Sequence, residues 1–541
     1  MIVKYAVDCY NIFMPRPKPL VLVILDAFGV STERDGNPVF EARKPTFDRI
    51  DQWFPFTTLQ ASGVAVGLPW GEAGNSEVGH LTMGAGRVIN HHLPRIISSV
   101  HDGSFFENER FRKAADHAIS RGGRLHIAGL VSSGSVHSYI DHLYALLDFT
   151  RDKHIPRVYL HLFTDGKDAP PKEGAVFFAE LEKRLASKWP HVRLGTVVGR
   201  FYAMDRDGNW ERTQRAYELL TQGKGVVIGV PSRYLAESYA RGITDEFVEP
   251  AVIGEDGEGT IRSGDALMFM NFREDSMRQL ADAFVREQFD HFPHIPIEDL
   301  FLVTMTDYEK EWSHLAAFPS PGIRFPLAEV LGEEGLRHIH IAETNKYAHV
   351  TYFFNGGRET PFKNEERVLI PSVTAPHPDD IPQMRASEVT AAILEHMHAY
   401  DVIIANFANA DLVGHSGNFS AASRTVEVLD ESVGALVNSI MNSDGVMIIT
   451  GDHGGIELKR NVISGEKRTE HSINPVPFYL IGKQFKRGVL RTDAEILTLK
   501  KEVGGILTDI APTVLDLLHV RKPHEMTGTS LLPFLMRQME L

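Results

Sequence analysis

Short apolar runs alternate with longer segments of mixed polarity along most of the chain. Clear runs occupy 124–130 (RLHIAGL), 157–165 (RVYLHLFTD), 192–199 (VRLGTVVG) and 265–272 (DALMFMNF). Each has the length of one β-strand, whereas the charged stretch at 205–220 has the character of an amphipathic helix. Strands that alternate with helices in this way predict an α/β fold with mainly parallel sheets.

Three further apolar runs are followed by an aspartate. The runs VLVIL, DVIIANFANA and VMIITG precede Asp26, Asp411 and Asp452. Ligands of open parallel sheets collect beyond the carboxyl ends of the strands, so three such aspartates can share one site although they are far apart in the sequence. Each of them taken alone is more simply interpreted as a cap of the following helix or turn, because that role is commoner.

The length and the punctuation of the chain predict more than one domain. A chain of 541 residues is too long for one ordinary core, and the Pro/Gly-rich stretch at 318–326 reads as a linker. We expect an N-terminal extension at 1–19, one domain built from 20–90 and 321–541, and an inserted domain at 91–320.

Composition and charge narrow the choice of partners. The chain is 43% hydrophobic and 23% charged, as globular proteins are, and none of its apolar runs approaches the roughly 20 residues of a membrane span. A formal net charge of −15 argues against nucleic acid and anionic membranes as partners. The single cysteine, Cys9, cannot form an internal disulfide, and the N-terminus lacks a signal-peptide pattern, so we expect the cytoplasm. Small molecules and metal ions are therefore the expected partners.

Histidines accompany the strand-end aspartates. The segment DLVGHSG places Asp411 and His415 on one face of a helix or tight turn, GDHGG holds Asp452 and His453, and TEHSINPVPFYL supplies His471. Carboxylates together with imidazoles suit Mn²⁺ or Zn²⁺, and two ions roughly 4 Å apart stabilise both oxygens of a phosphoryl transfer. One histidine among 25 is more often a surface or packed residue than a ligand, so the clustering carries this interpretation.

The glycine-rich segment GEAGNSEVGH, at 71–80, contains Ser76. A serine hydroxyl is weakly acidic and needs a neighbouring base or a bound cation before it acts as a nucleophile. The segment is not the GxSxG elbow of the serine hydrolases, because Val78 stands two residues after the serine. Activation by a metal ion is therefore preferred here to a hydrolase triad.

Segments spread over nearly the whole chain after residue 19 resemble, in the same order, the signature segments of cofactor-independent (2,3-bisphosphoglycerate-independent) phosphoglycerate mutase, a family of the alkaline phosphatase superfamily. They are LVILDAFG, GNSEVGHLTMGAGR, SGSVHS, DGKDAPP, GRFYAMDRD, NFRED, TNKYAHVTYFFNGG, DLVGHSG, DHGG and EHSINPVPFYL. The resemblance implies an α/β fold, in which an alkaline-phosphatase-like three-layer domain with a mainly parallel sheet is interrupted by an inserted smaller α/β transferase domain. It also implies two bound divalent ions and a monomeric protein. Mn²⁺ is the ion expected first, with Mg²⁺, Co²⁺ or Zn²⁺ as alternatives.

Residue matching to this family implies a role for each site residue. Ser76 is similar to the serine that takes the phosphoryl group, Asp168 to the acid and base for the substrate hydroxyls, and Lys346 to a residue that neutralises charge on the transferring group. The matched metal ligands are Asp411, His415 and His471 for one ion, and Asp26, Ser76, Asp452 and His453 for the other. The matched substrate-binding residues are His137, Lys167, Asp168, Arg200, Arg206, Arg273 and Lys346.

The resemblance implies a two-step reaction of glycolysis and gluconeogenesis. The serine takes the phosphoryl group of 3-phosphoglycerate as a phosphoserine, and the 2-hydroxyl of the glycerate then takes it to give 2-phosphoglycerate. Two other hypotheses stay open. One is a metal-dependent phosphatase or a phosphomutase that acts on another phosphorylated small acid. The other is a non-catalytic binding protein that kept the fold, against which the complete set of metal-ligand residue types argues.

Several positions depart from the pattern of the family. Ala27 stands where the family commonly has glycine, Gly455 where it has asparagine, and Tyr139 where it has a second histidine. Lys167 and Ser276 each replace an arginine, and the loss of one charge-assisted hydrogen bond costs about 1.5–3 kcal/mol. The departures leave the metal ligands intact and reduce the number of arginines in the inserted domain.

Overall fold

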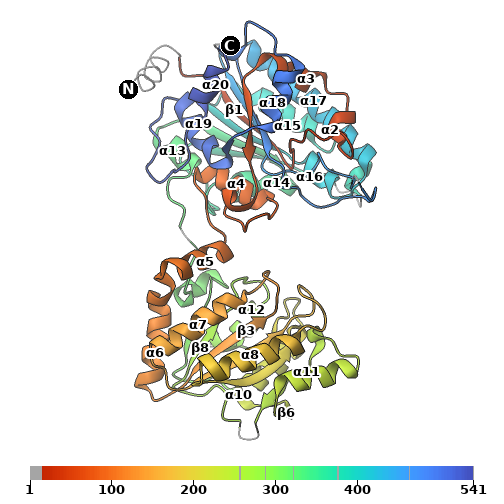
Figure 1. The fold of residues 1–541 in the computed structure, drawn as a ribbon. Helices are drawn as coiled ribbons and strands as arrows, with labels where there is room; N and C mark the ends of the chain where they lie inside the picture. Colours follow the sequence, from red (N-terminus) through yellow and green to blue (C-terminus); the bar gives the residue numbers. More distant parts are fainter. Residues whose placement is uncertain are drawn as a thin grey trace. The chain divides into compact units, whose positions relative to one another are not determined.

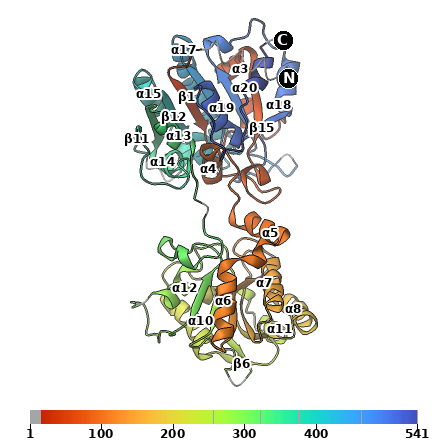
Figure 2. The same cartoon turned by 90° about the vertical axis from the view of Figure 1, so that its left-hand side faces the viewer.

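The computed structural model describes residues 15–539, except 255, 256, 287, 321, 374–376 and 462. The extension expected at 1–19 therefore lies outside the described residues as far as residue 14, and so does Cys9. The chain divides into two compact units. Unit 1 combines the first part of the chain, up to Asn90, with Gly322–Leu541, and unit 2 extends from His91 to Pro321 (Figures 1 and 2).

Unit 1 is built on an eight-stranded sheet with the order β11-β10-β12-β1-β13-β14-β2-β15. Strand β14 is antiparallel to both of its neighbours, and the other pairs are parallel. The strands are β1 (Leu20–Leu25), β2 (Phe56–Gln60), β10 (His338–Glu343), β11 (Glu365–Ile370), β12 (Val402–Phe407), β13 (Val446–Thr450), β14 (Val476–Ile481) and β15 (Val503–Ile506).

Helices cover both faces of this sheet, so unit 1 has three layers. Alternate residues of β1 point to opposite faces and all of them are buried, because β1 lies in the middle of the sheet. Leu22 packs in the core that contains α4, α13, α19 and α20, and Val23 in the core that contains α3, α15 and α17 (Figure 1). The helices of unit 1 are α2 (Pro38–Glu41), α3 (Pro45–Trp53), α4 (Ser76–Ala85), α13 (Leu327–Glu333), α14 (Thr344–Ala348), α15 (Ala386–His396), α16 (Asn409–Gly414), α17 (Phe419–Met441), α18 (Asp493–Lys501), α19 (Ile510–Leu517) and α20 (Leu532–Arg537).

Unit 2 has a seven-stranded sheet with the order β6-β7-β5-β4-β3-β8-β9. Strand β7 is antiparallel to β5 and parallel to β6, and the remaining pairs are parallel. The strands are β3 (Leu125–Val131), β4 (Val158–Thr164), β5 (Val192–Gly199), β6 (Val226–Ile228), β7 (Ala251–Ile253), β8 (Ala266–Phe269) and β9 (Phe301–Thr304).

Helices also cover both faces of the sheet in unit 2. Residues of α6, α7 and α8 pack in the core that contains Ile127, and residues of α10 and α12 in the core that contains Ala128. The helices are α5 (His92–Asp102), α6 (Glu109–Ser120), α7 (Ile140–Asp152), α8 (Gly174–Lys188), α9 (Arg200–Ala203), α10 (Trp210–Gln222), α11 (Pro231–Ala240) and α12 (Arg278–Val285). Each unit thus has its own sheet and its own pair of apolar cores.

The predicted α/β class with mainly parallel sheets is confirmed. The four apolar runs at 124–130, 157–165, 192–199 and 265–272 correspond to β3, β4, β5 and β8, and β3 extends one residue past its run, to Val131. The last strand is shorter than its run, because Asn271 leaves the ladder and its side chain accepts a hydrogen bond from the backbone N–H of Leu130 (2.9 Å). Over the described part of the chain, no helix combines the length and the apolar character that a membrane crossing needs.

Candidate active site

The order of the strands in unit 1 brings the three strand-end aspartates together. Strands β12, β1 and β13 are neighbours in the sheet, and Asp411, Asp26 and Asp452 follow them. All three side chains are buried. The backbone N–H of Ala27 donates to Asp452 Oδ1 (2.9 Å), which ties two of these strand ends to each other.

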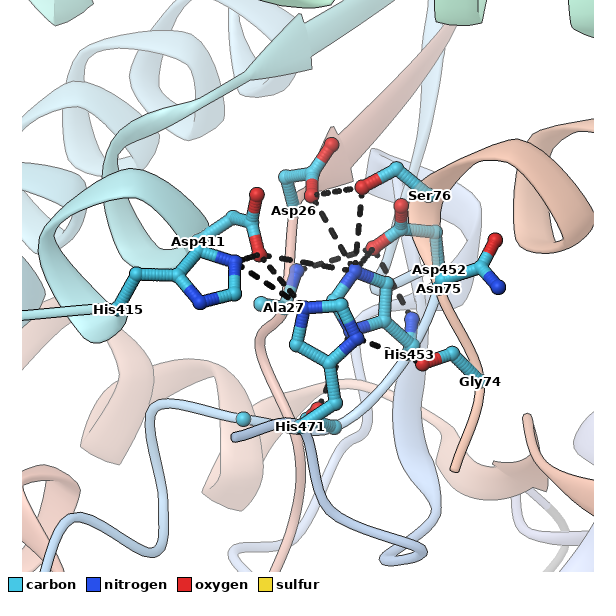
Figure 3. Close-up of polar contacts among 12 residues, drawn as sticks. Asp26, Ala27, Gly74, Asn75, Ser76, Asp411, His415, Asp452, His453 and His471 are labelled. Atoms are coloured by element: carbon cyan, nitrogen blue, oxygen red, sulfur yellow. Dashed lines mark hydrogen bonds and ion pairs between the residues drawn. The ribbon is translucent and has the colours of Figure 1, made fainter. Parts of the chain in front are cut away.

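Two histidines complete two groups of potential metal ligands (Figure 3). One group is Asp411, His453 and His471, and the other is Asp26, Asp452 and His453, with the ligand atoms of each group within 4.8 Å of one another. His453 belongs to both groups, since its Nε2 lies 3.5 Å from Asp26 Oδ1 and 3.8 Å from Asp411 Oδ1. The two groups therefore adjoin each other.

His415 lies at the solvent side of this cluster. It follows α16 directly, and its Nε2 is 3.3 Å from Asp411 Oδ1 and 3.2 Å from His471 Nε2. The Nδ1 atom of His415 contacts the carbonyl oxygen of Thr469 (3.0 Å), and this contact orients the ring so that Nε2 faces Asp411. The side chain is about half exposed, so an ion held here would be open to water on one side.

Ser76 is the first residue of α4, and Asn75 caps this helix by accepting a hydrogen bond from the N–H of Val78 (3.0 Å). The Ser76 hydroxyl donates to Asp26 Oδ1 (2.9 Å) and lies 3.2 Å from His453 Nε2 (Figure 3). The amino end of a helix favours negative charge, because its backbone N–H groups are free and the helix dipole is positive there. A phosphoryl group on this oxygen would therefore be stabilised.

Lys346 enters the cluster from α14, which follows the neighbouring strand β10. Its buried ammonium donates to Ser76 Oγ (2.6 Å), Asp26 Oδ1 (2.8 Å) and Asp411 Oδ2 (2.6 Å). Burial alone would lower the pKa of Lys346, but the adjacent carboxylates of Asp26 and Asp411 overcome this effect and raise it. Lys346 is therefore a fixed positive charge beside the serine hydroxyl.

The cluster carries more negative charge than its own cations balance, and two of its carboxylate oxygens have no hydrogen-bond donor among the described residues. Asp411 Oδ1 and Asp452 Oδ2 are buried and accept no hydrogen bond from the described residues. Burial opposes protonation of His453, yet the carboxylates of Asp452 and Asp26 raise its pKa to about 9. Carboxylate oxygens without a hydrogen bond, with imidazole nitrogens close by, form a donor set that fits divalent ions such as Mn²⁺ or Zn²⁺. The residues present thus fit the metal ions that the sequence predicts.

Two residues of this site were not found from the sequence. His80 Nδ1 contacts the carbonyl oxygen of Ser76 (2.8 Å), and Asn406 Nδ2 donates to Asp26 Oδ2 (2.8 Å) while lying 3.0 Å from His80 Nε2. Both orient residues of the cluster. A signal existed for each: His80 stands one helical turn after Ser76, and Asn406 is a polar residue inside an apolar strand run.

Ala27 and Gly455, two of the positions that depart from the family pattern, lie next to each other beside this cluster. A Cβ atom added at Gly455 would lie 3.1 Å from the Cβ of Ala27, closer than ordinary van der Waals contact. The methyl group of Ala27 therefore fills the space beside Gly455. Ala27 has a φ of 57°, a left-handed conformation that glycine adopts without strain.

In unit 2 a pocket of about 180 Å³ lies beyond the carboxyl ends of β8, β3, β4 and β5. These four strands are neighbours in the sheet, which is the usual place for a ligand in an α/β fold. The pocket gathers the residues of unit 2 that the family resemblance singles out, and also the serine that replaces an arginine: His137, Lys167, Asp168, Arg200, Arg206, Arg273 and Ser276.

Arg200 and Asp168 form the inner part of this pocket. Arg200 Nη1 donates to Asp168 Oδ2 (2.5 Å) and to Asp165 Oδ1 (2.7 Å). Asp165 is buried and also accepts hydrogen bonds from the backbone N–H groups of Lys167 (3.1 Å) and Asp168 (2.9 Å). Asp165 therefore shapes the loop that follows β4. Sequence reasoning missed this role, although its position at a strand end was a signal.

Arg206 and Arg273 form the outer part of the pocket and share one counter-ion. Asp275 Oδ2 lies 2.6 Å from Arg206 Nη1 and 3.1 Å from Arg273 Nη2. Both arginine side chains are about half exposed. An anionic ligand that reaches these guanidinium groups therefore has to compete with Asp275.

Ser276 is buried, and its hydroxyl forms a hydrogen bond with the ring of His137. Arg200 Nη2 lies 3.0 Å from His137 Nε2, and since arginine only donates, Nε2 must be the acceptor. The proton of the neutral ring is then on Nδ1, which donates to Ser276 Oγ (2.9 Å). Burial and the charge of Arg200 lower the pKa of His137 to about 4, so the ring is neutral near pH 7.

Comparison with known proteins identifies close relatives. Residues 96–310 match the family model described as the BPG-independent PGAM N-terminus. The chain is 46% identical over 518 residues to a 2,3-bisphosphoglycerate-independent phosphoglycerate mutase of Moorella thermoacetica, covering 95% of this chain and 98% of that protein. It is 44% identical over 520 residues to the protein of the same name from Clostridium tetani, covering 95% and 99%. A crystal structure of Leishmania mexicana phosphoglycerate mutase at low cobalt concentration is similar, with a TM-score of 0.62, 28% identity and coverage of 96% and 98%.

Proposed function

The chain belongs to the family of 2,3-bisphosphoglycerate-independent phosphoglycerate mutases, and from this premise we propose that it interconverts 3-phosphoglycerate and 2-phosphoglycerate through a phosphorylated Ser76. The enzyme is an isomerase that transfers a phosphoryl group within one molecule. Its reaction belongs to glycolysis and gluconeogenesis. The identities of the nucleophile, the ions and the substrate-binding residues are the substance of the proposal.

One observation carries the proposal. The buried hydroxyl of Ser76 lies 2.9 Å from Asp26 Oδ1, 3.2 Å from His453 Nε2 and 2.6 Å from the ammonium of Lys346, at the amino end of α4. A carboxylate to receive its proton, a cation to stabilise its negative charge and a helix end that favours phosphate all surround one oxygen.

Two divalent ions, which we propose to be Mn²⁺, would be held by two sets of side chains. When bound, they supply positive charge that makes the serine hydroxyl more acidic and neutralises the transferring phosphoryl group. The carboxylate oxygens of Asp411 and Asp452 that lack hydrogen bonds support this assignment. The proposed sets are Asp411, His415 and His471 for one ion, and Asp26, Ser76, Asp452 and His453 for the other.

In the first half of the reaction, Ser76 Oγ bonds to phosphorus while the bond between phosphorus and O3 of the glycerate breaks. The hydroxyl proton leaves towards Asp26, and the ammonium of Lys346 stabilises the charge on the transferring group. We assign to Asp168 the proton that the O3 atom of the glycerate takes up. The products are a phosphoserine and a neutral hydroxyl at carbon 3.

In the second half, the 2-hydroxyl of the same glycerate gives its proton to Asp168 and bonds to phosphorus. The bond between phosphorus and Ser76 Oγ breaks, and the serine regains its proton, so the enzyme returns to its starting state. In the pocket of unit 2, the proposed anchors of the carboxylate and the hydroxyls are His137, Lys167, Arg200, Arg206 and Arg273. Guanidinium groups suit this role, because they bind carboxylate and phosphate in bidentate fashion.

The single cysteine of the sequence fits a reducing compartment, and we propose that the enzyme works in the cytoplasm as a monomer. Light scattering of the purified protein is expected to give the mass of one chain. A mass of two or more chains would contradict the monomer and would leave the assigned chemistry untouched.

The test follows both products in one assay. Metal-depleted protein is supplied with Mn²⁺ and 3-phosphoglycerate, 2-phosphoglycerate is detected through enolase, and free phosphate is measured in the same samples. We expect 2-phosphoglycerate without free phosphate, and for Ser76→Ala a rate at least about 10⁴-fold lower. A matched control is Ser99→Ala, whose buried hydroxyl donates to the carbonyl oxygen of Ile96 (2.7 Å) within α5 of unit 2.

The same assay separates the second candidate. Ser276 replaces an arginine of the family pattern and brings no positive charge, which favours a metal-dependent phosphatase or a mutase for another phosphorylated acid. Release of free phosphate alone would identify a phosphatase. An absence of both products despite bound Mn²⁺ would direct the search to other phosphorylated acids.

A further inference from the structure

Glu457 is a buried carboxylate that belongs to neither group of potential metal ligands; its residue is 1% exposed. Its Oε2 accepts hydrogen bonds from the backbone N–H groups of Gly29 (3.1 Å) and Gly455 (2.8 Å). Its Oε1 accepts hydrogen bonds from the hydroxyl of Ser472 and from Asn474 Nδ2 (2.8 Å). Each oxygen of this side chain thus has two donors.

The four donors come from three loops, and each loop carries candidate metal ligands. We name these the ligand loops, at 26–29, 452–455 and 471–474. Glu457 is therefore a point at which all three are joined. The attachment points lie close to the ligands: Gly29 three residues after Asp26, Gly455 two residues after His453, and Ser472 directly after His471.

The packing around Glu457 shows how closely the loops approach it. A Cβ atom at Gly29 would lie 2.3 Å from the carboxylate carbon of Glu457, so only glycine allows the hydrogen bond from its N–H. The N–H of Ser472 also donates to the carbonyl oxygen of Gly454 (3.0 Å). The carboxylate fills the space between the loops and satisfies groups that would otherwise be buried without a partner.

We propose that Glu457 is a positioning residue that holds the three ligand loops in the geometry that binds the metal ions. The proposal rests on the proposed metal-dependent function, because Glu457 touches no reacting atom and acts only through the ligands. The carboxylates of Asp26 and Asp452 repel each other before an ion arrives, and rigid attachment of their loops offsets this repulsion. Partners of metal ligands of this kind typically contribute 10- to 100-fold to affinity.

The experiment compares two buried carboxylates of unit 1. Glu457→Gln keeps the shape of the side chain but turns an NH₂ group towards hydrogen-bond donors. Asp430→Asn is the matched control: Asp430 is also buried and accepts two backbone N–H bonds, from Thr46 (3.1 Å) and Phe47 (2.8 Å), at the start of α3, a helix without candidate ligands. Both variants are made in the full chain, freed of metal and titrated with Mn²⁺ by calorimetry, and their melting temperatures are measured without metal.

We expect the Mn²⁺ affinity of Glu457→Gln to be about 10- to 100-fold lower than that of the wild type. For Asp430→Asn we expect a lower melting temperature and an unchanged Mn²⁺ affinity. Ser472→Ala removes the attachment of one loop only, and we expect a smaller loss of about 2- to 10-fold in one of the two binding steps. Ser472→Ala and Asn474→Ala also test the proposal if Glu457→Gln does not fold.

The proposal is overturned if Glu457→Gln and Ser472→Ala bind Mn²⁺ as the wild type does. It is also overturned if Asp430→Asn loses as much affinity as Glu457→Gln at a similar loss of melting temperature, since Glu457 would then have a merely structural role. A wild-type protein that binds no Mn²⁺ would remove the metal ions from the proposed function, and this proposal with them.

Discussion

In both units the candidate functional residues lie beyond the carboxyl ends of adjacent parallel strands, but the side chains found there differ in charge and in exposure. In unit 1 the strand ends carry Asp26, Asp411 and Asp452, all buried. In unit 2 they lead to a pocket with several cations, and the side chains of Arg206 and Arg273 are 49% and 46% exposed. The same position in the fold thus holds a buried acidic cluster in one unit and an open pocket lined by both arginines and carboxylates in the other.

The difference also concerns the partners that each site already has. Unit 1 has carboxylate oxygens that accept no hydrogen bond from the described residues, and Lys346 is the lysine that pairs with them there, so further cations are the partners that this cluster suits. Unit 2 has arginines that are already paired with Asp275 and Asp168, so an incoming anion replaces an existing ion pair. Under the proposed function, unit 1 would hold the reacting groups strongly, and unit 2 would bind and release the substrate with a modest gain in free energy.

After the loss of Ser76 itself, the largest expected effect is that of Lys346→Met in unit 1. Loss of a fixed positive charge beside Ser76 should lower kcat about 10³-fold, or about 4 kcal/mol of transition-state stabilisation. In metal-free protein the carboxylates of Asp26 and Asp411 also lose the ammonium that donates to both, which should cost about 3 kcal/mol of unfolding free energy, and added Mn²⁺ should restore part of it.

Steady-state kinetics and calorimetric melting with and without Mn²⁺ check this prediction. Lys18→Met serves as the control, because Lys18 pairs with Asp401 (2.8 Å) just before β12, at the opposite end of this strand from Asp411. A kcat near the wild-type value for Lys346→Met would contradict the proposal that the reaction takes place at the acidic cluster of unit 1.

The second prediction concerns pH, where the two units should behave alike. Burial lowers the pKa of His142 in unit 2 to about 3, and that of His338 in unit 1 also to about 3. Their pKa in the unfolded chain is about 6.5, so the unfolded state takes up protons first and stability falls as the pH drops from 6.5 towards 3. For His142 the loss between pH 7 and pH 5 should be about 2 kcal/mol.

The nitrogen atoms of His142 have no hydrogen-bond partner among the described residues, so His142→Leu should remove this pH dependence without breaking a network. Hydrogen exchange of peptides from unit 2 at pH 7 and pH 5 measures the effect. Equal acid sensitivity in the variant and the wild type would show that another group is responsible.

Arg206→Gln in unit 2 should act on binding alone. We expect KM to rise about 10-fold, or about 1.4 kcal/mol, with little change in kcat, since an exposed guanidinium that leaves Asp275 for the substrate gains only the difference between two ion pairs. Kinetics and melting temperature are compared with those of Arg233→Gln, an exposed arginine paired with Glu237. A fall in kcat as large as that of Lys346→Met would erase the contrast between the units.

Ser276→Ala removes the acceptor of the His137 Nδ1 proton. A buried donor without a partner costs about 1 kcal/mol, so we expect KM to rise about 5-fold. Ser276→Thr keeps the hydroxyl and should restore most of the affinity. If the alanine variant has a normal KM, the hydrogen bond to Ser276 is not needed to position the ring of His137.

The smallest expected effect is the coupling between Ala27 and Gly455. Gly455→Ala should lower the melting temperature, because the new Cβ meets the Cβ of Ala27 at 3.1 Å. In an Ala27→Gly background the loss should shrink by about 1 kcal/mol. Additive losses in the double variant would show that the two positions are independent, and that the region behind the acidic cluster is less tightly packed than it is in the structure.

Much of the fold was predictable from the sequence, because the signals are local. A buried strand needs a short apolar run, and the runs at 124–130 and 157–165 correspond to β3 and β4. The aspartates that follow three such runs were recognised for the same reason, and the family resemblance added the residues of the pocket in unit 2. Their chemical roles stay predictions until the variants are measured.

The tertiary structure alone decided how these residues are held. Periodicity does not give the order of strands in a sheet, and it is this order that makes β12, β1 and β13 neighbours. Hydrogen-bond partners are equally invisible in the sequence: Ser276 and His137 are 139 residues apart, and Glu457 and Gly29 are 428 apart. Apolar patterning is a property of a few consecutive residues, whereas the satisfaction of a buried polar group depends on whatever distant segment the fold brings within 3 Å of it.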